Sequence, residues 1–342
     1  MTGRMDELLV VRNLVKSFET RNGVGLPFGH RDRDAIRAVD DISFEVDRRE
    51  ILGLVGESGS GKTTVARCLV RLVDPDSGSA FFDGADILGA SAQGLKRIRR
   101  RMQLIYQDPY SSLNPLIRVG DAIAEPARVH GLVSGRAAAD ALVLELLDAV
   151  GLTKGDARRY PREMSGGQRQ RVAIARALAL QPEMLIADEA VSALDVSVQA
   201  QIINLFADLV ENRHVAMVFI SHQLAVIAQL AGRVAVMYRG RIVEIGPTPT
   251  VYSSPQHPYT ALLLAAHPDI NQGKRSRSTA QPPDAGAASP DRTGCRFRAR
   301  CPLAQPICTE VDPPPVDLGD GHLSWCHVMP AASLSRDPKP GP

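Results

Sequence analysis

The segment ILGLVGESGSGKTTVARCLV, residues 51–70, decides the fold of this chain. Its first five residues are apolar and predict a buried strand, and VARCLV at its end has the apolar spacing of a helix. Between them GESGSGKT, residues 56–63, matches the pattern G-x-x-x-x-G-K-[ST]. Glycines in such a turn let backbone N–H groups surround phosphate oxygens, and the helix adds the positive end of its dipole. The segment therefore predicts a phosphate-binding loop rather than a glycine-rich turn with an incidental lysine.

Two side chains of this loop have specific roles in holding a nucleotide. Lys62 would reach the β- and γ-phosphates, and the Thr63 hydroxyl would ligate Mg²⁺. The nucleotide-binding residues predicted in this loop are Gly56, Glu57, Ser58, Gly59, Ser60, Gly61, Lys62, Thr63 and Thr64.

Two acidic residues follow a second apolar run. Asp188 and Glu189 come directly after MLIA, residues 184–187, so both carboxylates lie at the end of a predicted strand, where ligands bind in α/β sheets. Asp188 would hold Mg²⁺ and Glu189 would polarise the attacking water, which is a sufficient set for phosphoryl transfer. Without the phosphate loop, the same pair would indicate a helix N-cap.

The composition is typical of a folded cytosolic protein. The 342 residues are 44% hydrophobic, and 40 Lys and Arg against 38 Asp and Glu leave a net charge of +2. Dedicated nucleic-acid binders carry a concentrated positive field, so we expect no nucleic-acid partner. Residues 214–232 lack Asp, Glu, Lys and Arg, but polar residues interrupt them and favour a strand followed by a helix over a membrane span. The first residues do not have the pattern of a secretory signal.

Apolar runs along the chain predict an α/β protein. Strands are expected at residues 184–188, 215–220 and 233–238, separated by helices. Residues 119–150 are rich in Ala and Leu at helical spacing, which predicts a helical subdomain. Cys68, on the helix after the phosphate loop, is expected to fill a small space in the core.

A further string, MSGGQ at residues 164–168, precedes RQRVAIARALAL, which is rich in helix-forming residues. With the phosphate loop, the acidic pair, Gln107 after MQLIY and His222 after VFIS, all in the same order, the chain resembles the ATP-binding cassette (ABC) family of transporter ATPases. The resemblance extends over residues 8 to about 245. It implies an ABC-type P-loop fold with an N-terminal antiparallel β subdomain, a RecA-like core and a helical subdomain.

The resemblance also implies that ATP is held between two chains. In the family, the serine and glycines of this string face a γ-phosphate that is bound to the phosphate loop of the opposite subunit. The string SALD, residues 192–195, resembles the loop that crosses the dimer interface, although it also marks a helix start. The residues assigned to this second contact are Ser165, Gly166, Gly167, Gln168 and Asp195.

The remaining site residues follow from the same resemblance. Glu189, His222 and Gln107 form the catalytic set: His222 would contact the γ-phosphate, and Gln107 would sense Mg²⁺ and water. Phe18 takes the place of an aromatic ring that stacks on adenine, although it would also fit as a core residue. Most family members have Pro after the catalytic Glu, where this chain has Ala190, so the backbone beside Glu189 is less restricted. The predicted Mg²⁺ ligands are Thr63, Gln107 and Asp188.

Three strings resemble the branch of the family that serves oligopeptide and dipeptide importers. They are QDPYSSLNP, SALDVSVQAQI and GPTPTVYSSPQHPYTALLLAA, and an insertion at residues 20–36 resembles the second ATPase of the pair in such systems. The resemblance implies an ATP-hydrolysing subunit at the cytoplasmic face of the inner membrane. Its partners would be a second ATPase in a heterodimer, two membrane permease subunits and, indirectly, an extracytoplasmic peptide-binding protein. Nickel, glycosides or other small solutes stay open as cargo, and a soluble ABC ATPase without a transport role is the alternative.

Four cysteines gather near the end of the chain. Their spacing is C-x5-C-x6-C-x17-C, which fits neither a paired C-x2-C zinc ribbon nor the bacterial ferredoxin pattern. A [4Fe–4S] cluster, a zinc ion and reduced cysteines without a ligand all stay open, and disulfides are disfavoured in the cytosol. His322 and His327, in the same segment, are expected at the surface. The candidate cluster ligands are Cys295, Cys301, Cys308 and Cys326.

The domain boundaries follow from these patterns. The predicted parts are a nucleotide-binding domain (1–245) with its helical subdomain (about 108–182), a helical extension (246–270), a linker (271–294), a cysteine-rich segment (295–328) and a disordered tail (329–342).

Overall fold

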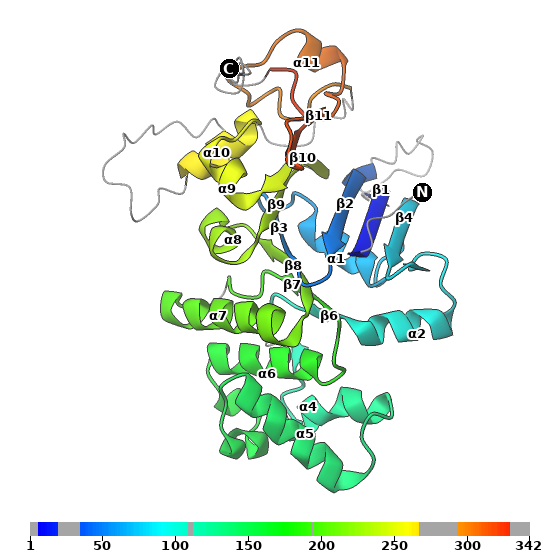
Figure 1. Ribbon diagram of the computed structural model, residues 1–342, viewed down its shortest axis with the longest axis vertical. Helices are drawn as coiled ribbons and strands as arrows, with labels where there is room; N and C mark the ends of the chain where they lie inside the picture. Colours follow the sequence, from blue (N-terminus) through cyan, green and yellow to red (C-terminus); the bar gives the residue numbers. More distant parts are fainter. Residues whose placement is uncertain (1–5, 20–34, 109–111, 193, 267–292, 329–342) are drawn as a thin grey trace, which may run out of the picture.

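The computed structural model describes residues 6–19, 35–108, 112–192, 194–266 and 293–328, which form the α/β protein in Figure 1. Residues 20–34 of the predicted insertion (20–36), most of the predicted linker and the tail from 329 lie outside the described residues. The strands are β1 (Glu7–Glu19), β2 (Ala35–Asp47), β3 (Ile51–Val55), β4 (Ser77–Phe82), β5 (Ala85–Asp86), β6 (Met102–Ile105), β7 (Met184–Asp188), β8 (Ala216–Ser221), β9 (Arg233–Tyr238), β10 (Arg241–Pro247), β11 (Val316–Asp317) and β12 (Leu323–Ser324). The helices are α1 (Lys62–Leu69), α2 (Ala92–Arg101), α4 (Val119–Val129), α5 (Gly135–Ala149), α6 (Gly166–Leu178), α7 (Val196–Arg213), α8 (Leu224–Leu230), α9 (Thr248–Ser253), α10 (Pro258–Ala266) and α11 (Ile307–Glu310), with 3-10 turns η1 (Lys154–Arg158) and η2 (Pro161–Glu163).

Two sheets organise the molecule. The larger one has the order β11-β12-β10-β9-β3-β8-β7-β6, and its five strands from β9 to β6 are parallel. The smaller one, β2-β1-β4-β5, is antiparallel. The predicted α/β fold is confirmed, as is the N-terminal antiparallel β subdomain that the family resemblance implies.

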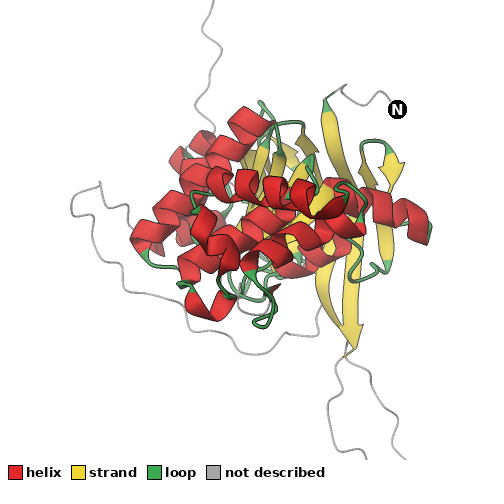
Figure 2. Cartoon of the chain, turned by 90° about the horizontal axis from the view of Figure 1, so that it is seen from below, coloured by secondary structure: helices red, strands yellow, loops and turns green. Residues whose placement is uncertain are grey.

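The central strands are buried on both faces because alternate side chains enter two different cores. In β3, Val55 belongs to the core shared with α4–α8, whereas Leu52 and Leu54 belong to the core shared with α1 and the small sheet. Fully apolar runs such as ILGLV and MLIA therefore form central strands. Cys68 is 1% exposed in the second core, as expected. Helices therefore cover both faces of these strands, and Figure 2 shows most of the helices grouped together with the strands behind and beside them.

Helices α4, α5 and α6, with the turns η1 and η2, all lie between β6 and β7 in the chain. They pack on one another through small and branched apolar residues, among them Ala124, Val143, Leu147 and Ile174, which are at most 4% exposed. Figure 1 shows this part of the chain, in green, extending away from the two sheets. It falls within the predicted helical subdomain, whose boundaries stay predictions.

The last described segment, residues 293–328, joins the core sheet rather than forming a separate unit. Strand β12 pairs antiparallel with β10 through Ser324 with Glu244 and Leu323 with Ile245, and β11 pairs with β12. Phe297 is 1% exposed and lies in the same core cluster as the helices. We call residues 293–328 the C-terminal module.

Candidate functional site

The chemically important loops meet because three parallel strands end side by side. Val55 of β3 is in register with Ser221 of β8, and Ile220 of β8 with Asp188 of β7. The phosphate loop follows β3, Asp188 is the last residue of β7 with Glu189 directly after it, and His222 follows β8. The phosphate loop therefore shares one edge of the sheet with residues that are more than 100 positions later in the sequence, and ligands bind at this edge in α/β folds.

The phosphate loop has the closed, glycine-dependent shape that its sequence predicts. Gly61 has φ +104°, and a Cβ there would lie 2.0 Å from the carbonyl oxygen of Ala38, so only glycine fits. The Lys62 ammonium donates to the carbonyl oxygens of Gly56 at 2.8 Å and Glu57 at 3.0 Å. Lys62 is only 4% exposed, and this burial lowers its pKa despite the carboxylates nearby. A buried cation at the start of α1 suits a multiply charged anion such as a triphosphate.

Two of the three residues predicted to bind Mg²⁺, Thr63 and Asp188, are in direct contact. The Thr63 hydroxyl donates to Oδ1 of Asp188 at 3.1 Å, and Asp188 is 5% exposed. Burial raises the pKa of Asp188, and the neighbouring charge of Glu189 raises it further. A hydroxyl and a desolvated carboxylate are hard oxygen ligands of the kind that Mg²⁺ prefers, so this pair fits the predicted metal.

Glu189 is held by three neighbours. Its backbone N–H donates to the carbonyl oxygen of Ile220 at 3.0 Å, and its Oε2 accepts from Nε2 of Gln107 at 2.9 Å. Nδ1 of His222 lies 3.6 Å from Oε1 of Glu189. The structure thus brings together the catalytic set predicted from the sequence.

The backbone of Glu189 is in the left-handed region, with φ +47°, which costs a non-glycine residue about 1 kcal/mol or more. The Ser192 hydroxyl donates to the carbonyl oxygen of Glu189 at 3.0 Å, and Ala190 beside it is 2% exposed. These contacts fix the backbone of Glu189 without the proline that the family usually has at position 190.

The second nucleotide contact predicted from the sequence lies at the start of α6. Ser165 caps this helix: its hydroxyl accepts from the N–H of Gln168 at 3.3 Å, and the Gln168 side chain accepts from the N–H of Ser165 at 3.1 Å. Gly167 is required because a Cβ there would lie 2.3 Å from Cγ1 of Val198 on α7. Ser165 is an exposed residue at the positive end of a 13-residue helix.

Asp195 is the N-cap of α7. Its Oδ1 accepts from the N–H of Val198 at 2.9 Å and from the Ser197 hydroxyl at 2.8 Å. Within one chain, the interpretation of SALD (192–195) as a helix start is therefore correct. Val196 is 83% exposed, which leaves an apolar side chain in solvent beside Asp195, the residue predicted to face a second subunit.

Phe18 is on the surface. It pairs with Ile36 across β1 and β2, its side chain is 42% exposed, and the Lys16 ammonium lies 5.5 Å from its ring centroid. The core interpretation of Phe18 is wrong, and the ring is open to a ligand.

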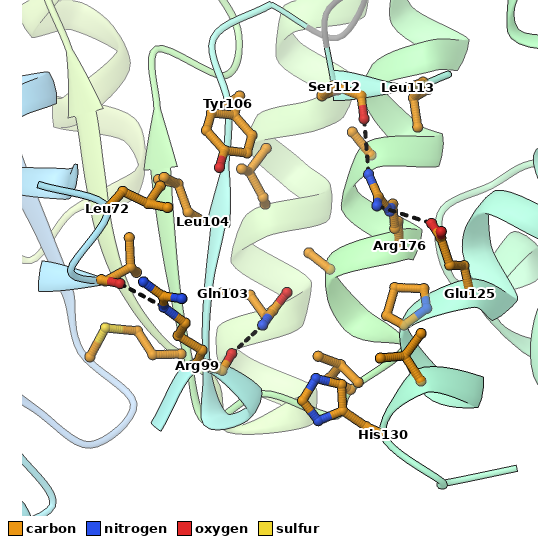
Figure 3. Close-up of a pocket in the computed structure, with 18 residues that line it drawn as sticks. Leu72, Arg99, Gln103, Leu104, Tyr106, Ser112, Leu113, Glu125, His130 and Arg176 are labelled. Carbon is orange, nitrogen blue, oxygen red and sulfur yellow. Dashed lines mark hydrogen bonds and ion pairs between the residues drawn. The ribbon is translucent and has the colours of Figure 1, made fainter. Parts of the chain in front are cut away.

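A groove of about 390 Å³ lies between the core sheet and the helical part of the chain, next to the segment that follows Gln107 (Figure 3). Apolar side chains line much of it, including Tyr106 and Val129, which are 42% and 66% exposed. On one side of the groove, Arg176 donates to the carbonyl oxygen of Ser112 at 2.9 Å and to Glu125 at 3.2 Å. This contact ties α6 to both the loop after Gln107 and α4.

Comparison with known proteins agrees with this geometry. Residues 39–192 match the family described as ABC transporter, and residues 243–308 match the oligopeptide/dipeptide transporter C-terminal region. A probable peptide ABC transporter ATP-binding protein of Sinorhizobium fredii is 48% identical over 97% of this chain and 93% of its own length. This chain belongs to the ABC transporter family.

Further relatives support the assignment. A putative peptide import ATP-binding protein of Brucella ovis is 42% identical over 93% of this chain and 97% of its own length. The glutathione import ATP-binding protein of Escherichia coli is 53% identical over 77% of this chain and 41% of its own length. Among solved structures, a dimeric ATP-binding cassette with ADP and phosphate bound superposes with a TM-score of 0.62 at 26% identity, over 70% of this chain and 99% of its own. Among the helices that the structure describes in this ABC protein, none has the length and apolar character to cross a membrane.

The four cysteines of the C-terminal module do not form a metal site in this structure. Among the described residues, no group of three or more His, Cys, Asp or Glu is placed to hold a metal ion, so the iron–sulfur prediction is not supported. Cys308 is 6% exposed, and burial raises the pKa of Cys295 and Cys301 and brings that of Cys326 to about 11. None of these four cysteines forms a disulfide.

His322 is buried, so the prediction of a surface position is wrong. It is 4% exposed, and its Nε2 lies 2.8 Å from Oε1 of Glu244. Glu244 is fully buried and also accepts from the N–H groups of Gln256 and His257. A buried carboxylate needs hydrogen-bond partners such as these, and no local feature of the sequence predicts them.

Sequence reasoning also missed contacts between the phosphate loop and the C-terminal part of the chain. The N–H of Glu57 donates to the Tyr259 hydroxyl at 3.0 Å, and Arg300 pairs with the Glu57 carboxylate. These partners are 202 and 243 residues from Glu57 in the sequence, so no motif spacing could indicate them.

Proposed function

We propose that this chain is the ATP-hydrolysing subunit of a membrane importer for oligopeptides or dipeptides. The observation that carries the proposal is Glu189, held by Gln107 and His222 beside the Thr63–Asp188 pair and the phosphate loop. Support for the cargo class comes from the match of residues 243–308 to the oligopeptide/dipeptide transporter C-terminal region and from relatives named as peptide import proteins.

The geometry gives each residue a role in hydrolysis. Lys62 and the loop amides bind the phosphates, and Thr63 and Asp188 would hold Mg²⁺, which neutralises charge on the phosphate oxygens. Glu189 orients the attacking water and accepts its hydrogen bond, while Gln107 and His222 keep the carboxylate in place. Ser165 and the N-terminus of α6 would contact the γ-phosphate bound to a second chain, so two chains close over each nucleotide.

The test of the hydrolytic role is Glu189→Gln, which preserves shape but removes the carboxylate. We expect ATP binding and ATP-dependent dimerisation to persist, while phosphate release falls by at least about a hundredfold, a usual loss for a positioned general base. Glu211→Gln, an exposed residue on α7, removes the same charge and serves as the control. Phosphate release from Glu189→Gln at the rate of the control would refute the assigned role.

We propose two permease subunits and a second ATPase as the partners of this chain, at the cytoplasmic face of the inner membrane, with an extracytoplasmic peptide-binding protein acting indirectly. The groove beside Gln107 supports the permease contact, since exposed Tyr106 and Val129 offer apolar surface to a short helix of a membrane subunit. Large apolar side chains that gather in solvent mark such contact sites. The exposed Val196 and Ser165 support the contact with another ATPase chain.

Val129→Asp tests the permease contact. A charge in the groove opposes burial of an apolar helix, so we expect co-purification with membrane subunits to be lost while ATP binding persists. Leu303→Asp, at an exposed site in the C-terminal module, is the control. Membrane subunits retained equally by both variants would exclude this groove as the docking site.

A further inference from the structure

The first residue after Gly56 in the phosphate loop carries a negative charge that the C-terminal module neutralises. Nη1 and Nη2 of Arg300 donate to Oε2 and Oε1 of Glu57 at 2.8 and 2.9 Å, which is a bidentate pair. Bidentate pairs fix the orientation of both groups and are the strongest ion pairs in proteins. The Arg300 side chain is only 12% exposed, whereas that of Glu57 is 41% exposed.

Glu57 is contacted through all of its polar groups. Its N–H donates to the Tyr259 hydroxyl at 3.0 Å. Its carbonyl oxygen accepts from the N–H of Ser60 at 3.1 Å and from the Lys62 ammonium at 3.0 Å. Glu57 therefore helps to orient Lys62, together with Gly56, and two residues outside the loop, Tyr259 and Arg300, hold Glu57.

Arg300 is itself held by an aromatic cluster formed by Tyr238, Tyr259 and Phe297. The ring centroids of these residues lie 4.6–5.4 Å apart, and the Arg300 guanidinium lies 5.8 and 5.9 Å from the rings of Tyr238 and Phe297. Tyr238 ends β9, and Phe297 and Arg300 are one turn apart in the module. The aromatic cluster thus holds the Arg300 side chain where it contacts the phosphate loop.

An unpaired carboxylate at this place would oppose nucleotide binding. A triphosphate carries several negative charges, and a like charge beside its binding loop is repelled most where solvent is partly excluded. We propose that Arg300 is a positioning residue for nucleotide binding, which neutralises Glu57 and holds the first turn of the phosphate loop ready for the triphosphate. This inference rests on the proposed function, since it concerns the same nucleotide site.

Calorimetric titration of the full-length protein with ATP tests the inference, together with ATPase kinetics. Arg300→Gln leaves Glu57 unpaired, and we expect its Kd for ATP to rise about tenfold at low salt, as suits the loss of one bidentate charged pair. The increase in Kd becomes smaller at about 1 M salt, because exposed charges are then screened within about 3 Å. At saturating ATP, kcat stays within about twofold of the wild type, since the reacting groups are unchanged.

Two further variants separate charge from structure. Glu57→Gln combined with Arg300→Gln removes the unpaired carboxylate, so most of the lost affinity returns. Arg298→Gln is the control, because it removes a charge from the same turn, where Arg298 donates to the carbonyl oxygens of Thr293 and Cys295. We expect the Kd of this variant for ATP to stay near the wild-type value. Urea midpoints of all variants show whether each protein is folded under the conditions of the titration.

The outcomes distinguish this inference from the proposed function. If the wild type binds ATP and Arg300→Gln binds it equally well, Arg300 does not position the loop. If the double variant binds ATP as weakly as Arg300→Gln, the unpaired carboxylate is not the cause of the loss and the neutralising role of Arg300 is overturned. A wild-type protein that neither binds nor hydrolyses ATP would overturn the proposed function itself.

Discussion

Asp40 connects three parts of the molecule, and its removal should lower stability strongly. It lies on β2, is 1% exposed, and accepts from Nη1 of Arg37 at 2.8 Å and Nε of Arg241 on β10 at 2.9 Å. Arg296 of the C-terminal module pairs with the same carboxylate. Burial alone would raise the pKa of Asp40, but the hydrogen bonds from Arg241 and Arg37 and the charge of Arg296 hold it below the ordinary value of 3.8.

Asp40→Asn keeps the shape of the side chain and removes its charge. Breaking a buried ion pair by neutralising one member costs about 3–5 kcal/mol. The three arginine side chains keep 19–39% of their surface in solvent, so water compensates part of the loss. We therefore expect the free energy of unfolding to fall by about 3 kcal/mol, at the lower end of that range.

Urea unfolding at pH 7, followed by circular dichroism, measures this change. Asp41→Asn is the matched control because Asp41 is exposed and has φ +60°, a conformation that Asn tolerates well. Because the pKa of Asp40 is depressed on folding, its stabilisation is present above the ordinary carboxyl pKa and is lost as the pH falls through the folded-state value. The gap between wild type and Asp40→Asn should therefore close in acid. A loss below about 1 kcal/mol at pH 7, or a gap that does not close in acid, would refute the reasoning.

Two other predictions follow from the geometry. Gly167→Ala places a Cβ 2.3 Å from Cγ1 of Val198 and should cost about 2 kcal/mol in urea unfolding, whereas Gly166→Ala, with 3.8 Å to Leu194, should be nearly neutral. Recovery of Gly167→Ala by a second change, Val198→Ala, is expected, and no recovery would mean that this contact is not the cause. Burial brings the pKa of Cys326 to about 11, so iodoacetamide should label it at pH 8 about a hundredfold more slowly in the native protein than in urea, as judged by peptide mass spectrometry. Equal labelling rates would contradict the buried environment.

The core of the fold could be predicted because its signals are local. Strands β7 and β9 have the predicted bounds, since continuous apolar runs between turn residues mark buried parallel strands. The phosphate loop, the acidic pair and His222 each follow such a run, so their meeting at one sheet edge follows from strand order.

The contacts of the C-terminal module could not be predicted from the sequence. Arg300 looks like any surface arginine in a segment rich in charge, and its partner Glu57 is 243 residues away. The buried Glu244–His322 pair has the same character, because each residue type is usually exposed and only tertiary packing buries them together. The spacing of the cysteines suggested a metal site. In the structure, backbone hydrogen bonds of the module fix where the thiols lie, for example the one that the N–H of Cys295 donates to the carbonyl oxygen of Cys308.

Strand β12 has a consequence for the solubility of shortened versions of this protein. It pairs with β10 (Arg241–Pro247), which would be an edge strand of the large sheet without it. Unpaired backbone groups on a border strand attract strands of other molecules. A version that stops after residue 266 would keep every nucleotide-binding motif. In it β10, with Ile242 and Ile245, would be an unpaired edge strand that other molecules can contact. Such a version is expected to self-associate, and a charged residue on that border would be the first remedy to engineer.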